Sequence, residues 1–466
     1  MFQFLTVTQA GCRRSFPPHL LHRITTLAIS LVVAIAAQVS YAQPVNAKSA
    51  NRPNIVLIMA DDMGYECVGA NGGESYKTPA LDKLAATGMR FTHCYSQPIC
   101  TPSRVQIMTG IYNSRNYVRF GLLKPQATTF GHLLKRSGYA TCIVGKWQLS
   151  GGIEAPEKFG FDGQCLWQLS RRPSRYPNPG LEINGKEVDF TTGQYGPDIV
   201  SDYLCDFIER NKKGPFFAYY PMVLPHWPFE PTPDSSDWNP EAAGILKGYG
   251  NIRYFGDMVA YTDKMVGKIV AKLEATGIRD RTLVLFTCDN GTFVRIKSRM
   301  NGEYIQGGKG LMTAAGTHVP LIASWPSVIK KPSVCDDLID FSDVLPTLAE
   351  LGGANVPAKL SIDGRGFVPQ LQGLAGDPRR WVYCWYYRNG KVGEAKGGES
   401  ARTKRYKLYK DGRFFDTASD RLEKSPLAAG QLDSVARQVH EQLQAVLNRY
   451  TRKDVRKKAK QKKAAS

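Results

Sequence analysis

The chain has 466 residues, a length that usually corresponds to two or three domains and allows a large hydrophobic core. Apolar residues make up 42% and charged residues 22%, which excludes a coiled coil, a collagen and a wholly disordered chain. The net charge of +20 is concentrated at the ends: the first 50 residues carry four bases and no acid, and the last 15 carry eight bases and one acid. The part between the ends is only mildly basic, and we expect no nucleic-acid partner.

The amino terminus has the pattern of a signal peptide. A largely apolar run at 26–37 follows Arg13, Arg14 and Arg23, and it precedes the small-residue cleavage site Ser40-Tyr41-Ala42. The alternatives are a buried helix or a membrane anchor, but twelve residues fall short of the roughly 20 needed to span a bilayer. We therefore predict a signal peptide over residues 1–42. The mature protein is then secreted or periplasmic, with no stable membrane insertion after cleavage.

Cysteine usage gives little support to a zinc site. The sequence has ten cysteines but no C-x-x-C pair and no H-E-x-x-H segment. Removal of Cys12 with the signal peptide leaves nine, so at least one thiol is unpaired or chemically altered. Cys142 and Cys288 stand in apolar runs, where we expect buried and inert thiols.

Apolar runs predict buried strands at 54–60, 139–145, 215–223, 282–288 and 319–324. Thr78-Pro79 begins a predicted helix that Gly88 ends, and helical spacing of apolar residues predicts another over 255–276. Strands that alternate with helices indicate an α/β sheet covered on both faces. Such sheets build their sites at the carboxyl ends of the strands. The residues expected to converge there are Asp61, Asp62, Lys146, His226, Asp289 and Asn290.

The composition changes after about residue 370. Trp381–Tyr387 is strand-like, Asp411-Gly412 marks a hairpin turn, and 432–449 is an amphipathic helix. The lysine-rich tail could contact anionic polymers, but its low complexity favours a solvated, disordered segment. The predicted parts are a signal peptide (1–42), a catalytic α/β domain (52–370), a smaller C-terminal α+β subdomain (371–450) and a basic disordered tail (451–466).

Two polar pairs at strand ends suit a hard cation. Asp61-Asp62 and Asp289-Asn290 offer carboxylate and amide oxygens, which Ca²⁺ and Mg²⁺ prefer. Each pair alone is also a common turn sequence. Cys100-Thr101-Pro102-Ser103-Arg104, followed by Thr109-Gly110, indicates a helix that begins at a cysteine. The positive end of a helix makes a thiol acidic and reactive, although an incidental cysteine is the alternative.

The C-T-P-S-R segment with its downstream T-G resembles the signature of the type I sulfatases, the formylglycine-dependent arylsulfatase family of the alkaline phosphatase superfamily. Further segments follow in the family's order: N-I-V-L-I-M-A-D-D-M-G (54–64), G-K-W (145–147), L-P-H-W-P-F (224–229), D-N-G (289–291), G-K-G (308–310), H-V-P (318–320) and R-T-K-R-Y-K-L-Y (402–409). The resemblance covers about residues 52 to 449. It implies an α/β fold in which helices sandwich a large mixed sheet, as in alkaline phosphatase, with a smaller C-terminal α+β subdomain.

The resemblance also implies a mechanism. In the family a maturing enzyme oxidises the signature cysteine, here Cys100, to formylglycine, whose hydrate attacks the sulfur of a sulfate ester. Ca²⁺, or Mg²⁺ in its place, would activate this hydrate. The implied metal ligands are Asp61, Asp62, residue 100, Asp289 and Asn290. The implied catalytic residues are Cys100, Arg104, Lys146, His226 and Lys309, and the implied substrate contacts are Lys146, Gln148, His226 and Lys309. Fixed positive charge from Lys146, His226 and Lys309 would suit an anionic ester.

The sequence departs from the family's pattern at two places. Gln148 stands where the family usually has a histidine that accepts a proton during sulfate release, and glutamine cannot accept one near neutral pH. The family's E-G-G run before V-P is replaced by a segment with Ala314, Ala315, Gly316 and His318. We interpret the second change as a variant within an active subgroup, because every expected metal ligand is kept.

The expected activity is hydrolysis of a sulfate ester on a small molecule or, by analogy, on a carbohydrate. One alternative is a phosphoesterase or phosphonate monoester hydrolase of the same superfamily. Another is a non-catalytic protein that binds sulfated glycans, which the glutamine at 148 favours. Arginines and aromatic residues that could face a sugar are Arg171, Arg172, Arg175, Tyr176, Trp385, Tyr386 and Arg388.

Overall fold

The computed structural model describes residues 52–167, 173–394 and 397–451. The predicted signal peptide, the tail from residue 452, and Arg171 and Arg172 lie outside these ranges. Within them, no helix combines the length and the apolar character that a membrane span requires.

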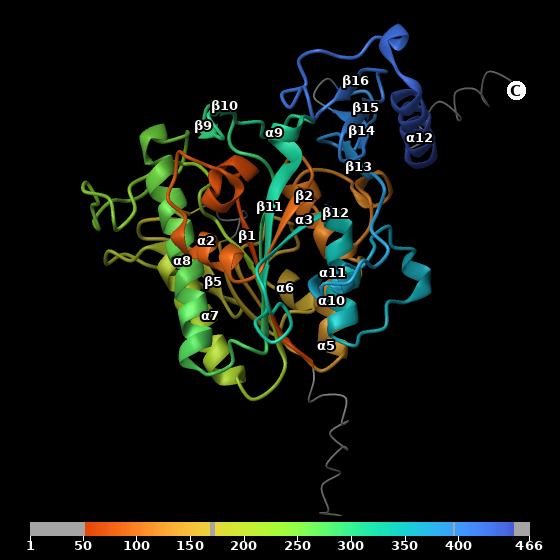
Figure 1. Ribbon diagram of the computed structural model, residues 1–466. Helices are drawn as coiled ribbons and strands as arrows, with labels where there is room; N and C mark the ends of the chain where they lie inside the picture. Colours follow the sequence, from red (N-terminus) through yellow and green to blue (C-terminus); the bar gives the residue numbers. More distant parts are fainter. Residues whose placement is uncertain (1–51, 168–172, 395–396, 452–466) are drawn as a thin grey trace, which may run out of the picture. The chain divides into compact units, whose positions relative to one another are not determined.

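A ten-stranded mixed sheet forms the centre of the fold, in the order β12-β2-β11-β8-β1-β7-β3-β4-β5-β6 (Figure 1). The five strands from β8 to β4 are mutually parallel. Every residue of β1 and β8 is buried, which explains their continuous apolar sequences. The strands are β1 (Asn54–Ala60), β2 (Met89–Tyr95), β3 (Ala140–Lys146), β4 (Gly163–Trp167), β5 (Gly180–Ile183), β6 (Lys186–Asp189), β7 (Phe216–Pro221), β8 (Thr282–Cys288), β11 (His318–Ser324) and β12 (Ser333–Asp340).

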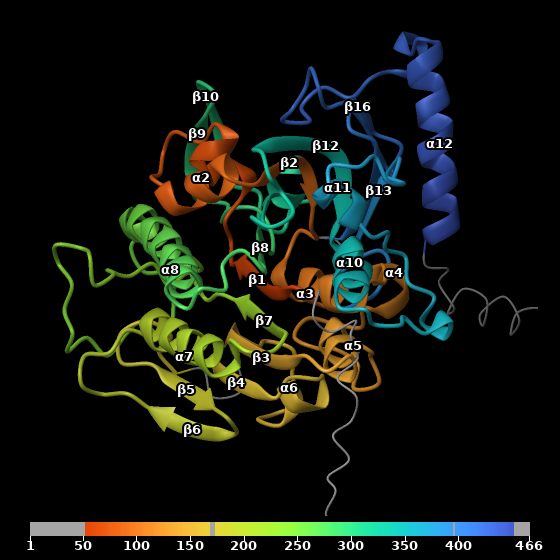
Figure 2. The same ribbon diagram turned by 60° about the horizontal axis from the view of Figure 1, so that its bottom comes forward.

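Helices cover both faces of this sheet (Figures 1 and 2). One layer contains α2 (Pro79–Ala86), α7 (Gly196–Asn211) and α8 (Phe255–Ala275), and the other contains α3 (Cys100–Thr109), α5 (Phe130–Arg136) and α10 (Val344–Leu351). The predicted apolar face of α8 is buried from Met258 to Leu273. Short elements complete this part: α4 (Asn113–Asn116), α6 (Ala155–Lys158), β9 (Lys297–Met300), β10 (Glu303–Gln306), α9 (Ala314–Thr317) and α11 (Val368–Leu371).

A separate four-stranded antiparallel sheet follows in the order β13-β14-β15-β16. Its strands are β13 (Val382–Tyr386), β14 (Gly398–Arg402), β15 (Tyr406–Tyr409) and β16 (Phe414–Asp416). The turn between β15 and β16 contains Asp411-Gly412, and Gly412 has the positive φ of 92° that such turns require. Helix α12 (Ser434–Tyr450) begins at Asp433, whose carboxylate caps the Ala436 amide, and it packs Leu443 and Leu447 into the core.

The predicted fold class, a large mixed sheet between helices with a smaller C-terminal sheet and helix, is confirmed. The predicted apolar strands are confirmed within two residues at each end. Neither β2 nor β12 has a continuous apolar run, and neither was predicted; they pair in parallel at one end of the large sheet. All nine cysteines at described positions are free thiols, and Cys142 and Cys288 are buried as expected.

Candidate active site

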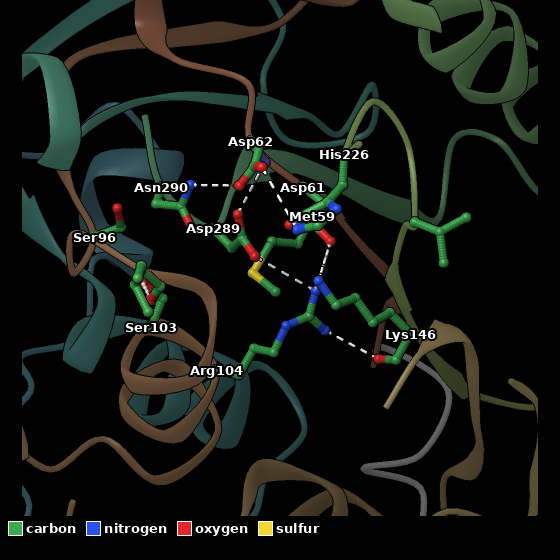
Figure 3. A network of polar contacts seen from close by, with 12 residues as sticks. Met59, Asp61, Asp62, Ser96, Ser103, Arg104, Lys146, His226, Asp289 and Asn290 are labelled. Atoms are coloured by element: carbon green, nitrogen blue, oxygen red, sulfur yellow. Dashed lines mark hydrogen bonds and ion pairs between the residues drawn. The ribbon is translucent and has the colours of Figure 1, made fainter. Parts of the chain in front are cut away.

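Two acidic pairs meet where β1 and β8 end (Figure 3). These strands run parallel with Ala60 opposite Cys288, so Asp61-Asp62 and Asp289-Asn290 leave the sheet side by side. The Asp62 amide donates to Asp289 Oδ1 at 3.2 Å, and Asn290 Nδ2 donates to Asp62 Oδ1 at 2.8 Å. The register of two strands therefore places four of the predicted cation ligands in one cluster.

The backbone around this cluster has little freedom. Asp62 has a φ of 68°, in the left-handed region that a non-glycine residue adopts at a cost of about 1–3 kcal/mol. A Cβ on Gly145 would lie 2.1 Å from the carbonyl oxygen of Pro221, and one on Gly291 would lie 1.8 Å from that of Ala315. The glycines of the G-K-W and D-N-G segments thus allow a close approach of backbones that positions Lys146 and Asn290.

Three basic side chains compensate the three carboxylates. Lys146 donates to Asp61, and Lys309 donates to Asp62 Oδ2 at 2.5 Å. Arg104 Nη2 lies 3.5 Å from Asp289 Oδ2, and Arg104 Nη1 donates to the Lys146 carbonyl at 3.0 Å. Arg104 and Lys146 are almost fully buried. The formal charges of these six groups sum to zero, so a bound divalent cation would leave the site positive.

His226 also faces the cluster. Its Nε2 lies 3.7 Å from Asp62 Oδ2, while its Nδ1 faces the Trp227 carbonyl at 2.5 Å and Arg175 Nη1 at 3.1 Å. Burial and the charge of Lys309 hold the pKa of His226 well below its usual value. Burial therefore opposes the fixed positive charge expected of His226, because a buried imidazolium beside other cations is unfavourable.

Cys100 is the first residue of α3 and only 2% exposed. Ser103 fixes this helix start: its hydroxyl donates to the Gln97 carbonyl at 3.0 Å and accepts from the Gln97 amide at 3.1 Å. Burial raises the pKa of the Cys100 thiol, although the charges of Lys146 and Lys309 act in the opposite direction. For the unmodified cysteine, desolvation thus opposes the acidic, reactive thiol that the helix position predicts.

The pKa values of the carboxyl groups differ because their neighbours differ. Burial alone would raise the pKa of Asp61, but Lys146, His226 and Arg104 hold it well below its usual value. Burial and the charge of Asp61 raise the pKa of Asp289 well above the ordinary value. Burial also raises that of Asp62 despite its bond from Lys309.

The donor set fits a hard divalent cation. Asp61 Oδ1, Asp289 Oδ2 and Asn290 Oδ1 are buried and have no hydrogen-bond partner among the described residues. Ligand atoms of Asp61, Asp62 and His226 lie within 4.8 Å of one another. Orphaned buried oxygens are costly, and oxygens of this kind are ligands of Ca²⁺ and Mg²⁺. The imidazole of His226 is a further possible ligand.

The two departures from the family's pattern occupy different environments. Gln148 is buried with a φ of 51°, and its Oε1 has no hydrogen-bond partner among the described residues. His318 instead stacks on the Tyr65 ring at 4.1 Å and its Nε2 contacts the Thr92 carbonyl at 2.9 Å. His318, in the segment 314–318, thus contacts the backbone of a neighbouring strand. The Oε1 atom of Gln148, by contrast, has no partner among the described residues.

A cavity of about 860 Å³ opens beside Lys309 and Ile99, the residue that precedes Cys100. Its far wall comes from the C-terminal sheet and includes Tyr386 and Arg388, two of the residues expected to face a sugar. Burial raises the pKa of Tyr386 to about 12, with Cys100 and Arg388 among the groups that influence it. The other lining residues are Val294, Gly310, Leu311, Met312, Thr313, Tyr387, Gly397, Gly398, Glu399, Tyr409, Lys410, Asp411 and Arg413.

The remaining candidates have other surroundings. Arg175 lies against His226 and 4.0 Å from the centre of the Trp167 ring, whereas Tyr176 and Trp385 are fully buried. Glu230 was not a candidate and no signal in the sequence indicates it. Its Oε1 accepts from the Ile245 amide at 2.7 Å, and burial raises its pKa to about 7.

Comparisons with known proteins agree with this geometry. The family model described as Sulfatase matches residues 53–354, and the model described as N-sulphoglucosamine sulphohydrolase, C-terminal, matches residues 302–450. The fold is that of the alkaline phosphatase superfamily, and the chain belongs to its type I sulfatase family. It is accordingly a sulfuric ester hydrolase.

Individual relatives extend over most of the chain. Arylsulfatase A of Homo sapiens is 31% identical over 420 residues, which cover 82% of this chain and 77% of that protein. A solved structure of Ps i-CgsB in complex with k-i-k-neocarrahexaose is 26% identical, with a TM-score of 0.71 over 86% of this chain and 93% of that one. The structure of BT4656 in complex with its substrate D-glucosamine-2-N,6-O-disulfate shares the fold, with 22% identity and a TM-score of 0.72 over 86% of this chain and 99% of that one.

Proposed function

We propose that the protein is an exported sulfatase that hydrolyses a sulfate ester on a saccharide, with a formylglycine made from Cys100 by a maturing enzyme and with bound Ca²⁺ or Mg²⁺. The observation that carries the proposal is the position of Cys100, at a helix start within electrostatic reach of Asp61 and Asp289. The formylglycine would supply the nucleophile, and the cation would supply positive charge that activates it.

The residues of this chain would bind and orient the ester. Asp61, Asp62, Asp289 and Asn290 would hold the cation, and Arg104 would brace residue 100. Lys146 and Lys309 would hold the sulfate, because both carry charge and lie at the same cluster. Lys309 would protonate the leaving oxygen, because it carries a proton beside Asp62. His226, the other expected donor, lies near the same carboxylate, but its lowered pKa makes it the less favourable proton donor.

Sulfate release is the step for which this chain lacks the family's usual base. Gln148 can hold a hydrogen bond through its free Oε1 but cannot take a proton. We propose that water or a carboxylate at the cation site accepts the proton instead, which predicts that release limits turnover.

A saccharide is the proposed substrate because of the cavity beside Lys309. Its volume of about 860 Å³ is in the range of small-molecule sites and exceeds what a sulfate alone needs. Its wall combines the Tyr386 ring with the charged Arg388, a pairing suited to a sugar that carries polar or anionic groups. The complexes of Ps i-CgsB and BT4656 with saccharides support this choice.

Export remains a proposal from the sequence. Residues 1–42 have the signal-peptide pattern described above, and cleavage after Ala42 would release a secreted or periplasmic protein. We further propose that the mature chain consists of a catalytic domain (52–370), a C-terminal subdomain (371–450) and a basic tail. Sequencing of the mature amino terminus from the native host tests the cleavage site.

The decisive experiment combines mass spectrometry with activity. The peptide that contains residue 100 is expected to show an aldehyde in protein from the native host, and the protein is expected to release sulfate from an aryl sulfate. Cys100→Ser should abolish release, whereas Cys205→Ser, a half-buried thiol on α7, should retain it. An unmodified thiol in active protein would refute the nucleophile.

Two outcomes would favour the alternatives. Hydrolysis of an aryl phosphate or phosphonate without hydrolysis of the aryl sulfate would indicate a phosphoesterase or phosphonate monoester hydrolase. Binding of a sulfated polymer by fully matured protein, with no sulfate released over hours, would indicate a non-catalytic glycan-binding protein.

A further inference from the structure

A second polar cavity lies away from Cys100. Its volume is about 680 Å³, and it begins at Tyr112, beyond the last turn of α3. Cys100 is at the opposite end of this ten-residue helix, which is about 15 Å long. We call it the arginine cavity; its lining residues are Tyr112, Arg115, Ser361, Ile362, Asp363, Arg365, Asp377, Arg379, Arg380, Trp381, Arg449 and Tyr450. It shares no lining residue with the cavity beside Lys309.

The arginine cavity has a surplus of positive charge. Arg115 pairs with Asp363 at 2.6 Å, and Arg365 pairs with Asp377 at 2.7 Å. Arg379, another lining residue, is buried and pairs with Asp343. Arg380 and Arg449 are exposed, and the described residues place no carboxylate within ion-pair distance of either. Among the described residues, these two guanidinium groups at the cavity therefore have no carboxylate to compensate their charge.

An aromatic wall lies next to these arginines. The ring centres of Trp381 and Tyr450 are 5.5 Å apart, and Tyr112 stands edge-on to Tyr450 at 5.1 Å. Trp381 and Tyr450 are partly exposed, and the Arg449 guanidinium lies 5.2 Å from the centre of the Tyr450 ring. Arg379 donates to the Tyr112 hydroxyl at 2.8 Å, which holds that ring in place.

We propose that the arginine cavity binds a segment of sulfated polysaccharide and takes no part in hydrolysis. Guanidinium groups bind oxyanions through paired N–H donors, which suits sulfate esters on a sugar chain. The flat aromatic faces suit the apolar faces of sugar rings. The cavity exceeds the volume of a lone sulfate, so it fits a saccharide segment better than a free anion. The ligand class follows from the proposed saccharide substrate, but binding here does not depend on catalysis.

The site would keep the enzyme on a polymer between hydrolytic events. The chain beyond Tyr450 continues into the segment with eight bases, and these charges would raise the local concentration of any polyanion. The tail alone cannot select a sugar, because a run of lysines and arginines attracts polyanions by charge and not by structure. Selectivity for a sulfated saccharide would come from the cavity.

Binding of fluorescently labelled dextran sulfate at physiological salt tests the proposal. The full chain carries Cys100→Ser so that the probe is not hydrolysed, and the tail is present in every variant. We expect Arg380→Gln with Arg449→Gln to weaken binding about tenfold, because two charged contacts are lost. The matched control, Lys330→Gln with Lys331→Gln, removes two exposed charges elsewhere and should weaken binding about twofold or less.

Three results would overturn the proposal: equal weakening in the two double variants, unchanged affinity in both, or equally tight binding of single-stranded polyuridylate. Neutral dextran should not bind. In a chain that keeps Cys100, the variant with Arg380→Gln and Arg449→Gln should hydrolyse a small aryl sulfate at the wild-type rate. A lower rate would refute the proposal that this site takes no part in hydrolysis. Absence of aryl sulfate hydrolysis by the wild type would refute the proposed function without changing the binding result.

Discussion

Lys146→Met tests the electrostatic balance of the site most directly. The lysine is 1% exposed and forms an ion pair with Asp61, which is fully buried. Removal of one partner of a buried pair costs about 3–5 kcal/mol, because the other charge is left without compensation. Arg104 Nη2, at 4.0 Å from Asp61 Oδ2, would compensate only part of this loss.

The cost converts into a measurable shift of the melting temperature. For the roughly 400 residues that the structure describes, the unfolding entropy is about 0.8 kcal/mol/K, so the expected decrease in Tm in the presence of a chelator is about 4–6 °C. A bound dication would stabilise the carboxylate that Lys146 leaves behind. We therefore expect the decrease in millimolar Ca²⁺ to be half as large or less. Differential scanning calorimetry in both buffers gives the comparison.

Lys158→Met is the matched control. Lys158 also pairs with a carboxylate, Glu154 at 2.8 Å, but the two side chains are 66% and 69% exposed. An exposed pair contributes little, and we expect a shift within about 1 °C. A decrease for Lys146→Met as small as this control, or a decrease of the same size with and without Ca²⁺, would refute the electrostatic argument.

Three further changes probe separate features. The pKa of Glu230 is 4.5 in an unfolded chain and about 7 in the folded protein. The free energy of unfolding should therefore decrease as the pH rises between these values, by about 3 kcal/mol in total. Glu230→Gln should flatten this part of a Tm profile measured from pH 4 to 8. Gln148→His should raise steady-state sulfate release about tenfold and shorten any pre-steady-state burst, because it supplies the basic side chain that the glutamine lacks. Arg388→Gln should raise KM for a sulfated disaccharide about fivefold and leave kcat/KM for 4-nitrophenyl sulfate within twofold, since only the larger substrate reaches the cavity wall.

Each of these changes has an outcome that contradicts it. The pH dependence would be wrongly assigned if Glu230→Gln left the Tm profile unchanged. A steady-state rate for Gln148→His equal to or below that of the wild type would show that release does not lack a base. Equal effects of Arg388→Gln on both substrates would show that Arg388 does not contact the saccharide. Lys330→Gln is the control for a general loss of positive charge.

The sequence was sufficient to predict the strands that are buried on both faces. β1 and β8 have continuous apolar runs, and their limits are as predicted. β2 mixes polar and apolar residues, and it belongs to the sheet through its pairing with β11 and β12, which lie more than 220 residues further along the chain. Such pairing leaves no local pattern in the residues of β2.

The convergence of Asp61 and Asp289 followed from the rule that strand ends form the site. The pKa values of the site residues could not be predicted from the sequence, because they depend on how deeply each group is buried. The lowered pKa of His226 and the raised pKa of Cys100 both result from desolvation that no motif indicates. Contacts made by loops, such as that of Arg175 with His226, were beyond the reach of sequence spacing as well.

If Cys100 is converted to formylglycine as proposed, its burial would limit when the conversion can occur. In the folded protein its thiol is enclosed together with Asp289 and Lys309, which the ribosome adds about 190 and 210 residues later. A maturing enzyme could reach the thiol on the emerging polypeptide only until these later segments close over it. A precursor that completes folding first would be locked in the thiol form, and only unfolding would make it convertible again.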